Sequence, residues 1–222
     1  MEKTLDKKEL LASSPVRFFE PTGAALDEGE IGLLTAKKGL GKTSILVQFG
    51  IDTLLKDKAI VHVSFNQKSE NVITWYSSVL AEICKSHRVD VDELSDELFR
   101  NRTILNFNQN TFTLPKVVNT LKALKDNGIK LETIIVDDLD LLKTEVSDLN
   151  CFCDFIKEEK MTAWFSYNSE ASDLNQILPS EKMAKFNSVA HLLPETESVS
   201  LSILKKGEGK VKLNSKTLLM TK

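Results

Sequence analysis

Residues 31–43, IGLLTAKKGLGKT, decide the fold that this chain is expected to adopt. The apolar run at 31–36 is typical of a buried strand, and Gly39 and Gly41 interrupt it before an amphipathic stretch begins. Apolar residues then recur at helical spacing, which predicts a helix over 43–56. The stretch therefore predicts a strand, a tight glycine loop and a helix in direct succession.

The same alternation continues along most of the chain. Short runs rich in Val, Ile and Leu alternate with longer amphipathic stretches, a pattern typical of a parallel sheet with helical crossovers. Further strands are expected at 59–65, 103–107, 133–137 and 161–167, and further helices at 69–86, 90–99, 114–126 and 147–159. A polar loop is expected from 168 to about 179. From residue 189 strands follow one another, and a glycine-containing turn at 206–209 predicts a hairpin. The fold class is therefore α/β, with a mainly parallel sheet and a C-terminal β-hairpin.

Length, charge and cysteine usage set the broad class. A chain of 222 residues with 41% hydrophobic residues can bury one core, so we expect one domain over 1–222 with an N-terminal extension at 1–24. A net charge of −3 gives no general attraction for nucleic acid or anionic membranes. Cys84, Cys151 and Cys153 lack the spacing of a zinc site. No leader or membrane span is recognised, so a cytoplasmic location is expected.

Residues 36–43 carry the sharpest motif of the chain. They match a pattern of one small residue, four variable residues and then Gly-Lys-Thr, and they lie between a predicted strand and a predicted helix. Backbone N–H groups of such a loop surround phosphate oxygens, while Lys42 would neutralise the β- and γ-phosphates and Thr43 would bind Mg²⁺. We therefore expect ATP or ADP with Mg²⁺ to bind. The expected nucleotide-binding residues are Ala36, Lys37, Lys38, Gly39, Leu40, Gly41, Lys42, Thr43 and Ser44.

An acidic pair follows the apolar strand TIIVD at 133–137. A carboxylate at the end of a neighbouring strand commonly orients the water shell of the metal, which makes Asp137 the expected magnesium residue. The alternative is that Asp137 and Asp138 only end the strand and start a turn. Asp138 is either an acid that polarises the attacking water or a solvated loop residue.

The order of these segments resembles the RecA-like ATPases, particularly the KaiC-like and replicative-helicase-like branch. The similar segments are the lead-in at 27–34, the phosphate loop, the second strand with Asn66-Gln67, and the hairpin around 205–209. The resemblance covers about residues 25–215, and only the phosphate loop is specific. It implies a three-layer α/β/α core and a homo-oligomer with nucleotide sites at subunit interfaces.

The resemblance also implies roles for three further residues. Lys205 and Lys206 would reach the γ-phosphate bound by a neighbouring subunit, although they could equally be a solvated hairpin end. Asn168 would sense the γ-phosphate at the end of its strand, although polar residues are common where strands end.

One departure from the family pattern bears on turnover. The second strand of RecA-like ATPases usually ends in a Ser-x-Glu signature whose glutamate activates water, whereas this chain has Ser64-Phe65-Asn66. An amide cannot accept the proton, so general-base assistance is missing unless Asp138 or Glu70 supplies it. We therefore expect a nucleotide-dependent switch or assembly factor with a protein partner and slow or conditional ATP hydrolysis.

Two alternatives remain open. The loop also resembles that of ParA/MinD-type positioning ATPases, in which a lysine stands at the place of Lys37, but Lys38 occupies the place of a glycine. The second alternative is an ATP-driven motor on nucleic acid. The segment 168–185 has mixed charges and no aromatic platform, so nucleic-acid binding is not supported. Trp75 and Trp164 are expected to be core residues.

Overall fold

The computed structural model describes residues 7–65, 67–85, 87, 89–196 and 198–222. Within these residues one nine-stranded sheet has the order β3-β2-β4-β5-β1-β6-β7-β8-β9. All neighbours from β3 to β6 pair in parallel, and β7, β8 and β9 continue the sheet antiparallel. The strands are β1 Ile31–Ala36, β2 Ala59–Ser64, β3 Arg102–Asn106, β4 Leu131–Asp137, β5 Thr162–Asn168, β6 Ser188–Pro194, β7 Val199–Lys205, β8 Lys210–Leu213 and β9 Met220–Thr221.

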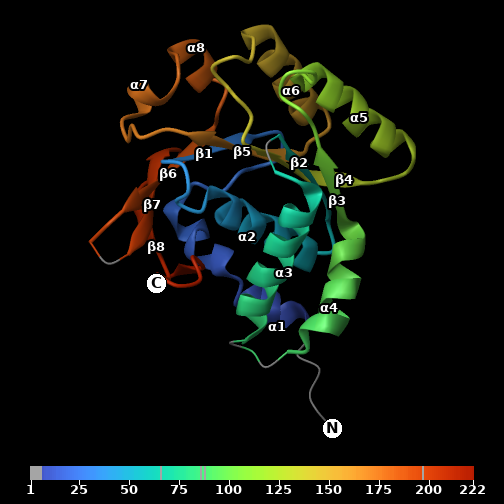
Figure 1. The fold of residues 1–222 in the computed structure, drawn as a ribbon, viewed down its shortest axis with the longest axis vertical. Helices are drawn as coiled ribbons and strands as arrows, with labels where there is room; N and C mark the ends of the chain where they lie inside the picture. The colour runs from blue at the N-terminus through green and yellow to red at the C-terminus, as the bar shows by residue number, and fades with distance from the viewer. Residues whose placement is uncertain (1–6, 66, 86, 88, 197) are drawn as a thin grey trace.

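Helices cover both faces of the sheet (Figure 1). Helices α5 and α6 pack together on one face, with α7 and α8 beside them, while α1, α2, α3 and α4 lie on the other. The helices are α1 Lys7–Ala12, α2 Lys42–Leu55, α3 Ser69–Lys85, α4 Val91–Leu98, α5 Leu114–Asp126, α6 Val146–Glu158, α7 Leu174–Ile177 and α8 Ser180–Met183, and short 3-10 turns occur at η1 Pro15–Phe18, η2 Glu20–Thr22 and η3 Phe99–Asn101. The predicted α/β class with a mainly parallel sheet and a C-terminal hairpin is confirmed.

Two apolar layers hold the sheet between the helices. Every residue of β1 is buried, and so are the last five of β4, as expected of parallel strands with helices on both faces. One core cluster joins the sheet to α5 and α6 through residues such as Leu121 and Phe152. On the other face, Phe49 of α2 stacks on Trp164 of β5 with ring centroids 4.8 Å apart, which confirms Trp164 as a core residue.

The segment before β1 is docked onto the domain. Leu10 and Phe19 are buried, and the Glu208 amide of the β7–β8 turn donates to the Thr22 carbonyl at 3.0 Å. Gly207 permits this approach, because a Cβ there would come within 2.0 Å of that carbonyl oxygen. Its φ of +99° also lies in the left-handed region.

Two short features differ from the sequence prediction. The loop expected from 168 to 179 contains helix α7, and α8 follows it directly. The sheet also gains β9, which pairs with β8. Each of these elements is too short for hydrophobic periodicity to reveal it. Among the described residues, none of the helices combines the length and apolarity that crossing a lipid bilayer requires.

Candidate functional site

The predicted phosphate loop, residues 36–43, connects β1 to α2 through two glycines in the left-handed region. Gly39 and Gly41 have φ values of +87° and +93°. Gly41 is also the N-cap of α2, so no side chain caps the first amides of this helix. Uncapped amides at a helix N-terminus, together with the helix dipole, favour an anion. The loop therefore has the geometry of a phosphate site.

The sheet order gathers five predicted residues at the N-terminal start of α2. Strand β5 lies between β1 and β4, and parallel pairing places the carboxyl ends of all three at one edge. Thr43 Oγ1 donates to Asp137 Oδ2 at 2.7 Å, and Lys42 Nζ donates to Asn168 Oδ1 at 2.6 Å. Asn168 Nδ2 in turn donates to Asp138 Oδ1 at 2.8 Å. Three segments that are far apart in the sequence, at residues 42–43, 137–138 and 168, are thus joined by hydrogen bonds.

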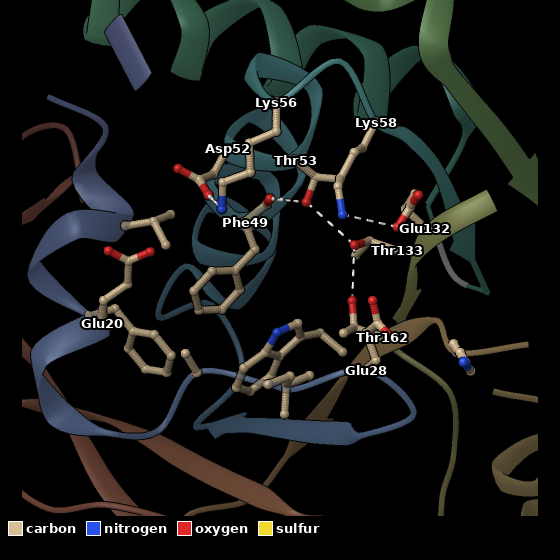
Figure 2. A pocket seen from close by; sticks show the side chains of 16 residues that line it. Glu20, Glu28, Phe49, Asp52, Thr53, Lys56, Lys58, Glu132, Thr133 and Thr162 are labelled. Atoms are coloured by element: carbon tan, nitrogen blue, oxygen red, sulfur yellow. Dashed lines mark hydrogen bonds and ion pairs between the residues drawn. The ribbon is translucent and has the colours of Figure 1, made fainter. Parts of the chain in front are cut away.

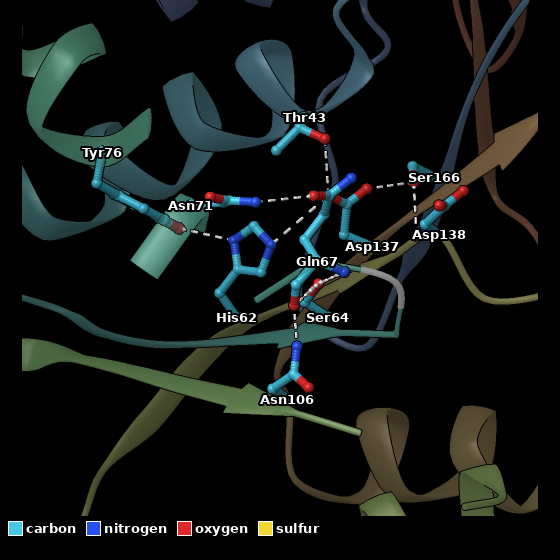
Figure 3. A network of polar contacts seen from close by, with 10 residues as sticks. All are labelled: Thr43, His62, Ser64, Gln67, Asn71, Tyr76, Asn106, Asp137, Asp138 and Ser166. Atoms are coloured by element: carbon cyan, nitrogen blue, oxygen red, sulfur yellow. Dashed lines mark hydrogen bonds and ion pairs between the residues drawn. The ribbon is translucent and has the colours of Figure 1, made fainter. Parts of the chain in front are cut away.

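Asp137 is a buried, strongly hydrogen-bonded carboxylate (Figure 3). Besides Thr43, Ser166 Oγ donates to its Oδ1, and His62 Nε2 lies 3.8 Å from its Oδ2. Burial on its own would raise the pKa of Asp137. The facing imidazole of His62 and the hydroxyls of Ser166 and Thr43 outweigh that effect, so the pKa lies below its ordinary value. The group therefore favours its ionised form, as a metal-binding carboxylate must.

Lys42 lies against the same carboxylates with only 8% of its surface exposed. Burial lowers the pKa of Lys42, and the charges of Asp138 and Asp137 oppose that lowering. A phosphate anion next to Nζ would act in the same direction as these carboxylates, because an opposite charge favours the ammonium form. The lysine side chain is thus already directed into the site.

The donor set fits Mg²⁺ held together with a phosphate. The Thr43 hydroxyl donates a hydrogen bond to Asp137, so the lone pairs of its oxygen stay available to a cation. The described part of the chain contains no cluster of three or more His, Cys, Asp or Glu residues that could hold a metal ion alone. Mg²⁺ suits such a site, since it usually keeps several waters and binds through one or two carboxylates plus substrate phosphates.

Asp138 is held in a strained backbone conformation beside a polar cavity. Its φ is +64°, which is unfavourable for a residue with a Cβ. The Asp138 backbone amide donates a hydrogen bond to Ser166 Oγ at 2.9 Å. Gln109 Nε2 donates to the Asp138 carbonyl, also at 2.9 Å. The adjoining cavity of about 690 Å³ is lined by Asp138, Asn168, Gln109 and other polar residues. Sequence reasoning missed Gln109, because a lone glutamine in a loop carries no local signal.

Other predicted residues lie elsewhere. Lys205 pairs with Val189 at the amino end of β6, so Lys205 and Lys206 lie at the edge opposite the phosphate loop. Lys205 donates to the Phe186 carbonyl, and Lys206 forms ion pairs with Asp27 and Glu30. Within one chain they therefore do not join the site. Lys37 and Lys38 are exposed on the loop, and Asn66 lies outside the described residues.

A second hollow of about 230 Å³ lies at the opposite edge of the sheet (Figure 2). Thr53, Thr133 and Thr162 form a row of hydroxyls along it, with oxygen separations of 3.4 and 3.0 Å. The charged residues at its rim form ion pairs with one another, Lys58 with Glu132 at 3.1 Å and Lys56 with Asp52 at 2.7 Å. The hollow is smaller than the roughly 300 Å³ of the smallest usual ligand pockets. The phosphate loop remains the candidate site.

The sequence matches no protein-family model and no curated protein.

Proposed function

We propose that this chain is a RecA-like protein that binds ATP or ADP with Mg²⁺ and acts as a nucleotide-dependent switch or assembly factor. The observation that carries the proposal is the pair of contacts from the start of α2, Thr43 to Asp137 and Lys42 to Asn168. They place a hydroxyl, a carboxylate, an ammonium and a polar strand end around uncapped helix amides. Phosphate and magnesium together require this combination.

Slow or conditional hydrolysis follows from the groups at hand. The sequence offers Asn66 where RecA-like ATPases usually carry a glutamate, and an amide cannot act as a general base. Asp138 is the carboxylate nearest to Lys42 and Asn168 in the described site, but Asn168 donates to its Oδ1. One of the two Asp138 oxygens is therefore already engaged with Asn168. Nucleotide state, rather than rapid turnover, is therefore the proposed output.

The binding claim is tested by measuring ATP and ADP affinity by calorimetry with Mg²⁺. We expect Lys42→Ala to weaken binding about 10- to 100-fold, because a hydrogen bond to a charged group contributes about 1.5–3 kcal/mol. The matched control is Lys58→Ala, which removes a lysine whose ion pair with Glu132 lies at the opposite edge. A wild-type protein that binds neither nucleotide would refute the proposal.

The hydrolysis claim needs turnover measured beside affinity. We expect tight binding with negligible turnover in the wild type, and a gain in Asn66→Glu toward the roughly 10²- to 10⁴-fold that general-base assistance provides. Fast wild-type turnover would contradict the switch and make Asp138 the candidate base. In that case Asp138→Asn should lose the activity.

A further inference from the structure

A buried polar pair stands behind the proposed magnesium carboxylate. His62 of β2 and Tyr76 of α3 are both 0% exposed. Tyr76 Oη lies 3.2 Å from His62 Nδ1, and His62 Nε2 lies 3.8 Å from Asp137 Oδ2 (Figure 3). These three side chains form a line from the interior of the helical layer to the carboxyl edge of the sheet. Tyr76 has no role in the site described so far, and His62 enters it only through its effect on the pKa of Asp137.

The direction of the hydrogen bonds follows from the donor chemistry. Burial raises the pKa of Tyr76, so its hydroxyl stays protonated. Because the Asp137 carboxylate can only accept, the arrangement that satisfies both neighbours of His62 has this hydroxyl donating to Nδ1. A neutral imidazole that accepts at Nδ1 carries its proton on Nε2, and that N–H faces Asp137. Nε2 is buried and has no hydrogen-bond partner among the described atoms. Moving roughly 1 Å or less would bring it within hydrogen-bonding distance of the carboxylate.

A glycine in α2 makes room for the tyrosine hydroxyl. A Cβ on Gly50 would lie 2.5 Å from Tyr76 Oη, closer than two such atoms can approach. Gly50 is in a helix interior, where glycine is less favourable than alanine by about 1 kcal/mol. The close approach of the hydroxyl gives a physical reason for glycine at this position.

We propose that Tyr76 and His62 are positioning residues that hold Asp137 from its buried side in the orientation that binds Mg²⁺. The inference rests on the proposed nucleotide and magnesium site. Ser166 fixes Oδ1 and Thr43 bonds Oδ2 from the loop side, so His62 supplies the third direction. Outer-shell hydrogen bonds of this kind typically change metal affinity by about 10- to 100-fold.

The experiment compares ADP affinity in Mg²⁺ with ADP affinity in EDTA, using calorimetry on the full chain. The ratio of the two affinities reports the magnesium contribution without any turnover. We expect His62→Leu and Tyr76→Phe to lower this ratio about tenfold or more. Their ADP affinity in EDTA should stay within about twofold of that of the wild type. His62→Gln retains an N–H donor near Nε2 and should keep most of the ratio.

Two further variants separate positioning from general packing. Gly50→Ala should lower the ratio as Tyr76→Phe does, because the new methyl group displaces the hydroxyl. Thr133→Val is the matched control, since it removes a buried hydroxyl at the other end of β4, where Thr133 contacts Thr162 at 3.0 Å. It should leave the ratio unchanged.

The outcomes are distinguishable. An unchanged ratio in Tyr76→Phe and His62→Leu, or an equal loss in Mg²⁺ and EDTA, overturns the positioning role. If His62→Leu does not fold, as judged by circular dichroism, Tyr76→Phe and Gly50→Ala decide the same question. Absence of ADP binding by the wild type in either condition would instead refute the proposed function.

Discussion

Lys37 stands at the outer tip of the phosphate loop. Its Nζ lies 3.4 Å from a carboxylate oxygen of Glu170, and the two side chains are 65% and 77% exposed. An ion pair this exposed contributes about 0–1 kcal/mol. The ion pair therefore holds the Lys37 side chain only weakly.

We predict that Lys37→Ala leaves ATP turnover and the assembly state within about twofold of the wild type, because such an exposed pair contributes little. Turnover assays and light scattering after size exclusion check this. Loss of nucleotide-dependent dimerisation would instead support the ParA/MinD-like alternative, in which this lysine is essential.

The lowered pKa of Asp137 predicts how the stability of the fold depends on pH. Its pKa is lowered in the folded state by His62, Ser166 and Thr43 despite burial. A lowered carboxyl pKa contributes stability that is present above the unfolded pKa, about 3.9, and is lost as pH falls through the folded value. We expect the wild type to be more stable to urea than Asp137→Asn at pH 7, with the gap narrowing below about pH 4. A gap independent of pH would contradict this account.

At the scale of elements, α2 links the phosphate loop to the end of the chain. Gln48 is buried, donating to the Leu218 carbonyl and accepting the Met220 amide, each at 2.9 Å. Leu218 packs where a Cβ of Gly41 would lie. Strand β9 is therefore attached to the helix that begins at the proposed site.

We predict that Gln48→Met detaches this segment. The change keeps the side-chain length but leaves the Leu218 carbonyl and the Met220 amide unpaired, at about 1–3 kcal/mol for each buried group. Urea unfolding measures the loss, and hydrogen exchange should show deprotection at Met220. Gln176→Met on the exposed side of α7 is the control and should change stability by less than about 0.5 kcal/mol.

At the scale of the whole molecule, Lys206 and the phosphate loop lie at opposite edges of the sheet. Lys206 can therefore reach a bound phosphate only in another copy of the chain, and it must first leave Asp27 and Glu30. Such a head-to-tail contact is heterologous and builds a ring if it closes or a filament if it does not.

We predict that ATP with Mg²⁺ raises the mass measured by analytical ultracentrifugation, that Lys42→Ala abolishes the rise, and that Lys206→Ala abolishes it without changing ATP affinity. A single mass under every condition would contradict nucleotide-dependent self-assembly.

Much of the fold could be predicted because its elements are local. The apolar runs gave β1, β4 and β5 to within two residues, and Leu114–Asp126 matched α5 at both ends, because Pro115 and Gly128 mark its limits. The phosphate loop was predicted from an equally local pattern. Its glycines, lysine and threonine are adjacent in the chain.

The sequence by itself determined the α/β class, the glycine loop between β1 and α2, and the acid at the end of β4. These features could be predicted because periodicity, glycine and residue type act over a few neighbours. Only the tertiary structure decided that β5 separates β1 from β4, and so joins Asn168 to Lys42 and Ser166 to Asp137. It also decided that His62 faces Tyr76 and that Lys206 lies at the far edge. The physical reason is that strand order and helix packing depend on contacts between residues far apart in the chain, which no local pattern encodes.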